Sequence, residues 1–492
     1  MYADALYKFK SKVICTLGPV SREVPVLEKM LRAGMKVARF NFSHGEHSYH
    51  QHTLDNLRIA SANTGILCGV LLDTKGPEIR TGFLANGDAV HLTAGSEVTL
   101  TTDYEHKGDE TCIAVSYKNL AKDVRPGSKI LAADGSITFT VLQCDVTGGK
   151  VTARVENNAK LGERKNMNLP GVVVDLPTIT EKDTNDLLEW GVKNKVDFIA
   201  ASFVRKGSDL DHIREVLGPA AATISIISKV ENQEGLDNFK DIVDKSDGVM
   251  VARGDLGMEI PMHQIFLAQK RMIKRCNEQG KPVVTATQML ESMTGAPRPT
   301  RAEATDVANA ILDGTDCVML SGETAAGGYP VEAVSVMAQI CAESEAHIDS
   351  EAQFRRILDR QKVPMDSIKE SLASTAVRCA HKVGARLIIS LARTGKLAQY
   401  IAKYRSPVPI LMLILDEEGV EAAESVARRS LVYRGIVPVV VKTADHPPGN
   451  YREQMLEALN HAKAMGLVKT GDQVVGLHAL GKDSVMKVLE VH

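Results

Sequence analysis

Residues 225–235 join a run of β-branched residues to two charged side chains, Lys229 and Glu231. Such a run is typical of a buried parallel strand that carries its charge at the carboxyl end. Because side chains alternate along a strand, Lys229 and Glu231 share a face. An ammonium group beside a hard oxygen ligand suits a phosphate group with its Mg²⁺. The alternative is an ordinary surface Lys–Glu pair, and this segment alone does not decide between the two.

A second group of polar residues alternates along residues 37–45, where Arg39, Asn41 and Ser43 lie opposite two phenylalanines. An Arg side chain suits a phosphate or a carboxylate, and the oxygens of Asn and Ser suit a hard cation. Polar groups beside a buried face need partners. Because all three come at the end of one strand, we favour a binding site over a polar network that satisfies itself.

Three further segments place polar groups where an apolar run stops. Residues 68–80 reach Asp73 and Thr74, and residues 281–288 end in hydroxyl groups that include Thr287. In residues 248–257, Asp255 lies between two glycines. Glycines there let backbone N–H groups approach an anion while the carboxylate faces a metal ion.

These side chains need a scaffold that brings the ends of many strands together. Eight apolar runs, each followed by a helical pattern, predict an α/β fold, and a (β/α)8 TIM barrel in preference to an open, doubly wound sheet. Such barrels keep their chemistry at the carboxyl ends of the strands. The runs are residues 12–19, 37–45, 68–80, 197–204, 225–235, 248–257, 281–288 and 316–323. Thr180 and Asp183 are predicted to cap a helix over residues 181–193.

The helical pattern stops between the third and fourth runs. Residues 77–170 are rich in turns and in strand-forming residues, which predicts a small inserted β-barrel domain after strand 3. An insertion at that point hangs over the active face and can act as a lid. The predicted domains are the catalytic barrel of residues 1–76 and 171–350, the lid of residues 77–170, and a C-terminal α/β domain of residues 351–492.

Length, charge and composition limit the classes of protein to which this chain can belong. At 492 residues the chain is too long for one core, and a net charge of −2 with 24% charged residues gives no basic surface for nucleic acid or a membrane. The eight cysteines lack CxxC spacing, which indicates reduced, buried thiols. The first residues do not form a signal-peptide pattern, and no apolar run reaches membrane-spanning length. We therefore expect a cytoplasmic enzyme.

Six segments resemble the motifs of the pyruvate kinase family. They occur in the family's order, and the resemblance extends over the barrel, the lid and the C-terminal region. The segments are residues 39–45, 72–80, 227–232, 251–257, 286–293 and 299–310. The resemblance implies transfer of the phosphoryl group of phosphoenolpyruvate to ADP, which gives pyruvate and ATP.

The resemblance also implies a role for each candidate residue. Catalytic roles go to Lys229, Arg39, Arg80 and Thr287. Phosphoenolpyruvate is expected to bind Arg39, Lys229, Gly254, Asp255 and Thr287, and ADP to bind Arg80, Asn41, His44 and Lys165. Mg²⁺ (or Mn²⁺) is expected at Glu231 and Asp255, and K⁺ at Asn41, Ser43, Asp73 and the Thr74 carbonyl.

Dependence on K⁺ is expected to rest on Glu78, which adds a negative charge beside the K⁺ ligands. In the family, members with Glu at this position resemble K⁺-dependent enzymes, whereas members with Lys carry the cation on the protein itself. The family also suggests a homotetramer. Ala392 and Leu397 stand where members regulated by fructose 1,6-bisphosphate have hydroxyl groups, which argues against activation by that sugar bisphosphate.

Two other functions stay open at this point. Lyases and carboxylases that act on phosphoenolpyruvate or on pyruvate enolates share a carboxylate-held Mg²⁺, but they require neither the Lys229 cation nor an inserted lid. A non-catalytic relative that senses metabolites or acts as a scaffold would be expected to have lost some ligands, and every barrel position named above is present. An assay of pyruvate formation with ADP, Mg²⁺ and K⁺ separates these functions.

Overall fold

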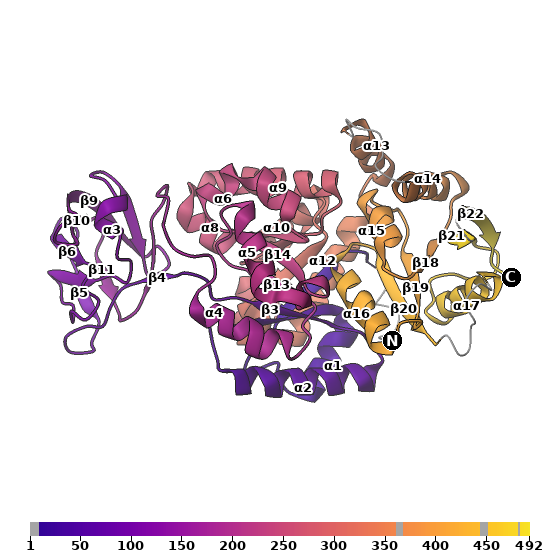
Figure 1. Ribbon diagram of the computed structural model, residues 1–492, viewed down its shortest axis with the longest axis horizontal. Coiled ribbons are helices and arrows are strands. Elements are labelled where there is room, and N and C mark those ends of the chain that lie inside the picture. Colours follow the sequence, from indigo (N-terminus) through magenta and orange to yellow (C-terminus); the bar gives the residue numbers. More distant parts are fainter. Residues whose placement is uncertain (1–8, 361–367, 443–450, 481–482) are drawn as a thin grey trace.

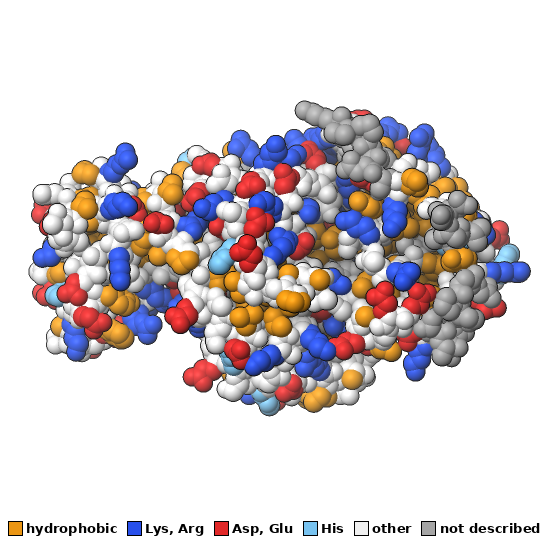
Figure 2. Space-filling view, in the orientation of Figure 1, with side chains coloured by type: hydrophobic (Ala, Val, Ile, Leu, Met, Phe, Trp, Pro, Cys, Tyr) orange, Lys and Arg blue, Asp and Glu red, His pale blue; other side chains and the backbone are white. Residues whose placement is uncertain are grey.

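The computed structural model describes residues 9–360, 368–442, 451–480 and 483–492, and its elements form three bodies in a row (Figure 1). An all-β body lies at the left, a barrel surrounded by helices lies in the middle, and an α/β body lies at the right. The chain enters the all-β body after β3 and returns to the barrel before α4. Figure 2 shows basic and acidic side chains interspersed over the visible face, which fits a net charge of −2.

The middle body is a closed barrel of parallel strands in the order β1-β17-β16-β15-β14-β13-β3-β2. The strands are β1 Lys12–Thr16, β2 Met35–Asn41, β3 Gly69–Asp73, β13 Phe198–Ala201, β14 Ser225–Val230, β15 Gly248–Ala252, β16 Val283–Ala286 and β17 Cys317–Leu320. Seven of the predicted runs contain one of these strands, and the run of residues 37–45 overlaps β2, which begins two residues earlier at Met35, so the predicted (β/α)8 barrel is confirmed. The strands are almost wholly buried because a parallel barrel strand is covered on both faces.

Helices cover the outside of this barrel. They are α1 Val24–Ala33, α2 His47–Thr64, α4 Glu181–Asn185, α5 Gly207–Leu217, α6 Gln233–Asp237, α7 Phe239–Lys245, α8 Arg253–Glu259, α9 Ile265–Gln279, α10 Arg301–Asp313, α11 Gly322–Ala325 and α12 Pro330–Ala346. Leu27, Met30 and Trp190 are buried between helices and strands. Ile14 and Met250 fill the inside of the barrel, which is therefore a packed core.

The helix predicted over residues 181–193 is present, but it changes from an α-helix to a π-helix along its length. Thr180 Oγ1 accepts a hydrogen bond from the Asp183 N–H, and the Asp183 carboxylate accepts one from the Thr180 N–H, so the predicted cap is confirmed. Only α4 is α-helical, because Asp186–Val192 continues it as a π-helix. The sequence pattern predicted the helix and its first residue, but it did not predict the change to a π-helix.

The all-β body is a seven-stranded sheet in the order β4-β12-β8-β9-β10-β6-β7 with a two-stranded sheet, β11-β5. Its elements are β4 Ile79–Arg80, β5 Val90–Leu92, β6 Glu97–Thr101, β7 Cys112–Ala114, α3 Leu120–Asp123, β8 Lys129–Ala132, β9 Ile137–Asp145, β10 Lys150–Val155, β11 Ala159–Leu161 and β12 Asn166–Asn168. The two edges of the larger sheet meet at a bridge between Thr81 and Val115. Leu100, Phe139 and Val151 fill the interior. The predicted small β-barrel is confirmed.

The C-terminal body is a five-stranded sheet in the order β20-β19-β18-β21-β22. Its strands are β18 Leu387–Ala392, β19 Ile410–Leu415, β20 Ile436–Val441, β21 Gln473–Leu480 and β22 Asp483–Glu490, and its helices are α13 Ser350–Arg360, α14 Ile368–Val383, α15 Lys396–Lys403, α16 Val420–Arg429 and α17 Tyr451–Ala464. Apolar runs at residues 386–391, 410–415, 437–441 and 473–477 predict the first four strands. No such run predicts β22, which runs antiparallel to β21 and mixes charged with apolar residues.

Buried ion pairs hold the C-terminal body against the amino ends of the barrel strands. Arg428 Nε donates to Asp197 Oδ1 at 3.0 Å, and Arg405 Nη1 donates to Asp316 Oδ1 at 2.8 Å. Leu431 of the short helix η5, Ser430–Val432, packs into the inner core of the barrel. The C-terminal body therefore closes the end of the barrel opposite the carboxyl ends of the strands.

All eight cysteines are free thiols, as predicted. Five of them are fully buried, at positions 15, 68, 276, 317 and 341. Within the described ranges, no helix combines the length and the apolar character needed to cross a membrane.

Candidate active site

The carboxyl ends of four neighbouring barrel strands, β14, β13, β3 and β2, place the predicted polar residues side by side. Lys229 Nζ lies 3.0 Å from Asp73 Oδ1 and 3.1 Å from Glu231 Oε1. Lys229 and Glu231 therefore share a face of β14, as their spacing predicted. The side chains of all three residues are at most a tenth exposed. This contact excludes the alternative interpretation as a surface pair.

Arg39 joins the same cluster from β2. Arg39 Nε donates to Asp73 Oδ2 at 2.6 Å, and Arg39 Nη1 donates to Thr16 Oγ1 at 2.9 Å. Burial alone would raise the pKa of Asp73, but Arg39 and Lys229 outweigh burial and hold that pKa below its usual value. Asp73 is therefore an anion that fixes two cations at the mouth of the barrel.

The same charges set the state of Lys229. Burial alone would lower the pKa of Lys229, but the carboxylates of Asp73 and Glu231 outweigh burial and raise it above its usual value. Lys229 therefore stays an ammonium ion. A buried cation in a fixed position is suited to meet negative charge on a phosphate group without reorganising.

Glu231 carries an oxygen that no hydrogen bond uses. Glu231 Oε2 accepts from the Phe203 N–H at 2.6 Å, but buried Oε1 has no hydrogen-bond partner, because its contact with Lys229 lacks hydrogen-bond geometry. Burial raises the pKa of Glu231 to about 8, Lys229 opposes the rise, and the charge of Asp255 adds to it. Two carboxylates that disfavour each other's charge fit a divalent cation between them.

Within the described ranges, no group of three His, Cys, Asp or Glu side chains could hold a metal ion. This is compatible with Mg²⁺ at Glu231 and Asp255, because Mg²⁺ is commonly held by one or two carboxylates, with water and substrate oxygens completing the shell. The donor set therefore fits a metal ion that is bound together with a phosphate-bearing substrate.

The ends of β15 and β16 form a tight wall beside Asp255. Thr287 has a positive φ of 74°, which is strained for a β-branched residue and is typical of functional sites. Its hydroxyl accepts from the Gly254 N–H at 3.2 Å. A Cβ on Gly254 would approach Thr287 Cγ2 to 3.0 Å, so a side chain there would crowd Thr287. Arg253 holds the wall in place, since its guanidinium donates to the Thr287 carbonyl at 2.7 Å.

The predicted K⁺ ligands come from adjacent strands. Asn41 and Asp73 face each other in the register of β2 and β3. Asn41 Oδ1 accepts from the Ser43 N–H at 3.1 Å, and the Thr74 carbonyl accepts from Ser202 Oγ at 2.7 Å. Oxygen atoms of the kind that bind a cation therefore lie around Asp73. Both oxygens of Asp73 itself already pair with Arg39 and Lys229.

The predicted nucleotide ligands fall into two groups. Arg80 lies in β4 at the start of the lid, and its Nη1 donates to the Arg164 carbonyl, next to exposed Lys165, at 2.8 Å. Asn41 and exposed His44 lie at the carboxyl end of β2 on the barrel. The two groups therefore stand on different bodies, the lid and the barrel.

Glu78 differs from its expected surroundings. Its carboxylate pairs with Arg80 Nη2 at 2.6 Å and lies 3.9 Å from Lys75 Nζ. The sequence analysis expected Glu78 to add a negative charge beside the K⁺ ligands. In the structure, an ion pair with Arg80 already balances that charge. Glu78 also lines a cavity of about 70 Å³ between the lid and the barrel, together with Asp255 and Asn232. Glu78 therefore lies in the same cavity as Asp255, one of the two carboxylates predicted to bind Mg²⁺.

Sequence reasoning missed Ser202. Its hydroxyl accepts from Lys229 Nζ at 2.7 Å, and it links that ammonium group to the Thr74 carbonyl. The signal was available, because Ser202 directly follows β13 and polar residues that follow barrel strands gather at the active face. The Phe203 N–H that holds Glu231 left no such signal, since every residue except proline carries a backbone N–H.

A (β/α)8 barrel with buried cations, and a buried carboxylate oxygen that accepts no hydrogen bond, at the carboxyl ends of its strands is typical of an enzyme of phosphate chemistry. A family model described as the barrel domain of pyruvate kinase matches residues 8–334, and the model of the family's alpha/beta domain matches residues 370–489. The chain belongs to the pyruvate kinase family.

Individual relatives agree over the full length of the chain. A cytosolic pyruvate kinase isozyme of Nicotiana tabacum is 60% identical over 98% of this chain and 96% of its own. The corresponding isozyme of Solanum tuberosum is 59% identical over the same shares. The crystal structure of a pyruvate kinase from Cryptosporidium parvum superposes with a TM-score of 0.93 at 44% identity and covers 99% of this chain and 97% of that one.

Proposed function

We propose that this protein transfers the phosphoryl group of phosphoenolpyruvate to ADP, with pyruvate and ATP as products. The observation that carries the proposal is buried Lys229, held as an ammonium ion beside a carboxylate oxygen that no hydrogen bond uses. Phosphoryl transfer spreads negative charge over the transferred oxygens, and fixed cations stabilise that charge. Lys229 would contact the group in flight, and Arg39 would bind its phosphate oxygens.

Mg²⁺ (or Mn²⁺) would be held by Glu231 and Asp255. The pyruvate kinase family generally depends on Mg²⁺ and K⁺. When bound, the divalent ion offsets negative charge on the phosphate oxygens. One oxygen of Glu231 is held by the Phe203 N–H, and the other, which accepts no hydrogen bond and lies 3.1 Å from Lys229 Nζ, would meet that ion.

The carboxylate of phosphoenolpyruvate would bind at the wall formed by β15 and β16. The N–H groups of Gly254 and Asp255 and the hydroxyl of Thr287 are its proposed donors. The Gly254 N–H donates to Thr287 Oγ1, so this N–H would have to turn from that oxygen to reach a substrate, whereas the Thr287 hydroxyl can accept one hydrogen bond and donate another. Its strained backbone holds the hydroxyl beside these N–H groups.

K⁺ would bind among Asn41, Ser43, Asp73 and the Thr74 carbonyl, since oxygen ligands select hard cations. ADP would bind between the lid and the barrel, with Arg80 and Lys165 on one side and Asn41 and His44 on the other. Arg80 would then exchange the Glu78 carboxylate for a nucleotide phosphate.

A coupled assay tests the proposal directly. Pyruvate formation is followed with phosphoenolpyruvate, ADP, Mg²⁺ and K⁺, and each component is then left out in turn. Pyruvate formed together with ATP, and only when ADP and Mg²⁺ are present, is the expected result. Pyruvate formed without ADP would favour a lyase or hydrolase acting on the same substrate. No turnover under any of these conditions would favour a non-catalytic relative.

We extend two further properties from relatives to this chain. The two plant relatives are named cytosolic isozymes, and we propose a cytoplasmic location. We also propose a homotetramer. Sedimentation velocity of the purified protein measures the assembly, and a single species of one or two subunits would contradict a tetramer.

A further inference from the structure

The barrel helix that follows β3 is separated from that strand by the whole lid. β3 ends at Asp73 and α4 begins at Glu181, so no short loop fixes where this helix lies. Side chains at the start of the helix instead bind the backbone that follows β2 and β3. These two backbone segments carry the residues that we assign to the K⁺ site.

Asp183 of α4 binds the segment after β3. Its side chain is buried, and its Oδ1 accepts from the N–H groups of Lys75 and Gly76 at 3.0 and 3.2 Å. Its Oδ2 accepts from the Thr180 N–H at 3.0 Å, which ties the same carboxylate to the start of the helix. Asp183 therefore fixes the backbone directly after Thr74, whose carbonyl is a predicted K⁺ ligand.

Lys182, one residue earlier, binds the segment after β2. Its Nζ donates to the Phe42 carbonyl at 3.0 Å. Phe42 lies between Asn41 and Ser43, two further predicted K⁺ ligands, and the Asn41 side chain accepts from the Ser43 N–H. A donor on the Phe42 carbonyl therefore fixes the peptide that sets the spacing of these two ligands.

Asp186 balances the charge of Lys182. It is buried, and its Oδ2 pairs with Lys182 Nζ. Its Oδ1 lies 2.7 Å from Nε2 of His47, the first residue of α2. A bare ammonium group would repel a cation bound to this segment, whereas an ammonium group paired with a carboxylate adds little net charge. Lys182 can therefore hold the ligand segment without opposing the ion.

We propose that Lys182 is a positioning residue for the monovalent cation, and that it raises the affinity for K⁺ by fixing the Phe42 peptide. The proposal rests on the K⁺ site of the proposed function. Removing a group that holds metal ligands in place typically lowers metal affinity by about 10–100-fold. Phe42 is also held by its N–H, which donates to the Asp73 carbonyl at 3.0 Å, and by stacking on His50 with ring centroids 4.3 Å apart. The effect is therefore expected at the lower end of that range.

Thermal unfolding of the full-length protein tests the proposal without turnover. Tm is measured at increasing K⁺, with tetramethylammonium keeping the total salt constant, and its rise gives an apparent Kd for K⁺. Lys182→Met is expected to raise this Kd about tenfold. Lys182→Arg, which keeps a charged donor, is expected to retain most of the affinity. Lys193→Met is the matched control, because Lys193 also pairs with an acidic residue four positions earlier, Glu189, and lies on the exposed surface of the same helix.

Turnover gives the second readout. The K⁺ concentration for half-maximal pyruvate formation should rise by a similar factor in Lys182→Met. Turnover at saturating K⁺ should stay within about twofold of the unmodified protein, because excess K⁺ refills the site. Lys182→Gln, which removes the charge but keeps a polar side chain, is a second variant with the same expected result.

An unchanged Kd for K⁺ in folded Lys182→Met or Lys182→Gln would overturn the proposal, and so would an equal loss of affinity in Lys193→Met. A loss of turnover that persists at saturating K⁺ with an unchanged K⁺ dependence would also contradict it. If K⁺ does not change the Tm of the unmodified protein, the K⁺ site itself is wrong. The pyruvate assay then decides separately on phosphoryl transfer.

Discussion

The two ends of the barrel hold buried lysines whose acidities shift in opposite directions. At the carboxyl ends, Asp73 and Glu231 raise the pKa of Lys229 despite its burial. At the amino ends, burial lowers the pKa of Lys36 to about 7. The two side chains are almost equally buried, at 8% exposed each, so burial does not distinguish them. Lys229 differs because its ammonium group lies 3.0 Å from Asp73 and 3.1 Å from Glu231.

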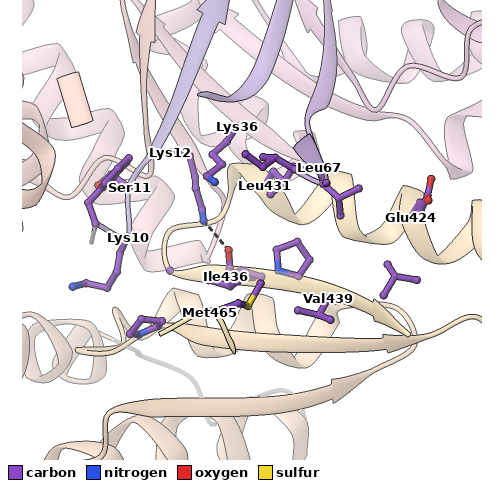
Figure 3. Close-up of a pocket in the computed structure, with 18 residues that line it drawn as sticks. Lys10, Ser11, Lys12, Lys36, Leu67, Glu424, Leu431, Ile436, Val439 and Met465 are labelled. Atoms are coloured by element: carbon purple, nitrogen blue, oxygen red, sulfur yellow. Dashed lines mark hydrogen bonds between the residues drawn. The ribbon is translucent and has the colours of Figure 1, made fainter. Parts of the chain in front are cut away.

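This difference shows how the neighbours of a buried lysine decide its charge. A lysine fixed between carboxylates is a permanent cation, which a phosphate meets without any change in protonation. A buried lysine beside another lysine, as Lys36 is beside Lys12 (Figure 3), loses its proton more readily. The first arrangement suits phosphate chemistry.

The largest expected effect comes from removing the permanent cation. Lys229→Met deletes the ammonium group and leaves Glu231 and Asp255 in place. Loss of one preorganised donor typically costs about 10²–10³ in rate, and loss of a full charge should cost at least as much. Steady-state turnover measures the change, and circular dichroism with thermal unfolding confirms that the variant folds. If Lys229→Met folds and keeps most of its turnover, Lys229 is not the catalytic cation, and the two ends of the barrel do not differ in this respect.

The next effect concerns the carboxylates that set the state of Lys229. Glu231→Gln and Asp255→Asn should each abolish activity at ordinary Mg²⁺ concentrations. The double variant should cost little more than either single one, because members of a unit are not additive. Turnover at a series of Mg²⁺ concentrations measures all three. Losses that multiply in the double variant would show that the two carboxylates work separately.

A smaller effect is expected at Glu78, which sits at the edge of the catalytic end. Activity should fall strongly when K⁺ is replaced by a large organic cation, and Glu78→Lys should weaken that dependence, because a cation on the protein replaces the free one. Turnover with and without K⁺ is the measurement. Glu78→Gln is the control, since it releases Arg80 without adding a positive charge.

The outcomes of this experiment separate two roles of Glu78. If Glu78→Gln and Glu78→Lys lose activity equally and keep full K⁺ dependence, Glu78 acts only by holding Arg80. Full activity of the unmodified protein without any monovalent metal ion would contradict the K⁺ prediction altogether.

The smallest effect is expected at the amino ends and concerns stability. Folding lowers the pKa of Lys36 from 10.5 to about 7, so the unfolded chain binds more protons between these values. The contribution of Lys36 to stability therefore rises as the pH increases above about 7. Lys36→Gln lacks this term, so its Tm relative to the unmodified protein should be higher near pH 7 than near pH 9. A difference in Tm that is constant across this range would show that Lys36 is not a destabilised cation.

Much of the fold was readable from the sequence. The eight barrel strands were predicted because parallel strands buried on both faces form unbroken apolar runs that end in polar residues. The cap at Thr180 was predicted because it depends on two side chains three residues apart. Strand β22 was missed because its exposed face carries charged residues that dilute the apolar pattern.

The sequence by itself also determined which residues reach the active face, since Lys229 and Glu231 are placed by the two-residue alternation of one strand. Only the tertiary structure decided what each charge meets. Asp73 and Lys229 are 156 residues apart in the sequence yet in contact, and Arg39 reaches the other oxygen of Asp73 from the neighbouring strand. A pKa and a binding preference arise from partners in space, and the linear pattern of a chain does not list those partners.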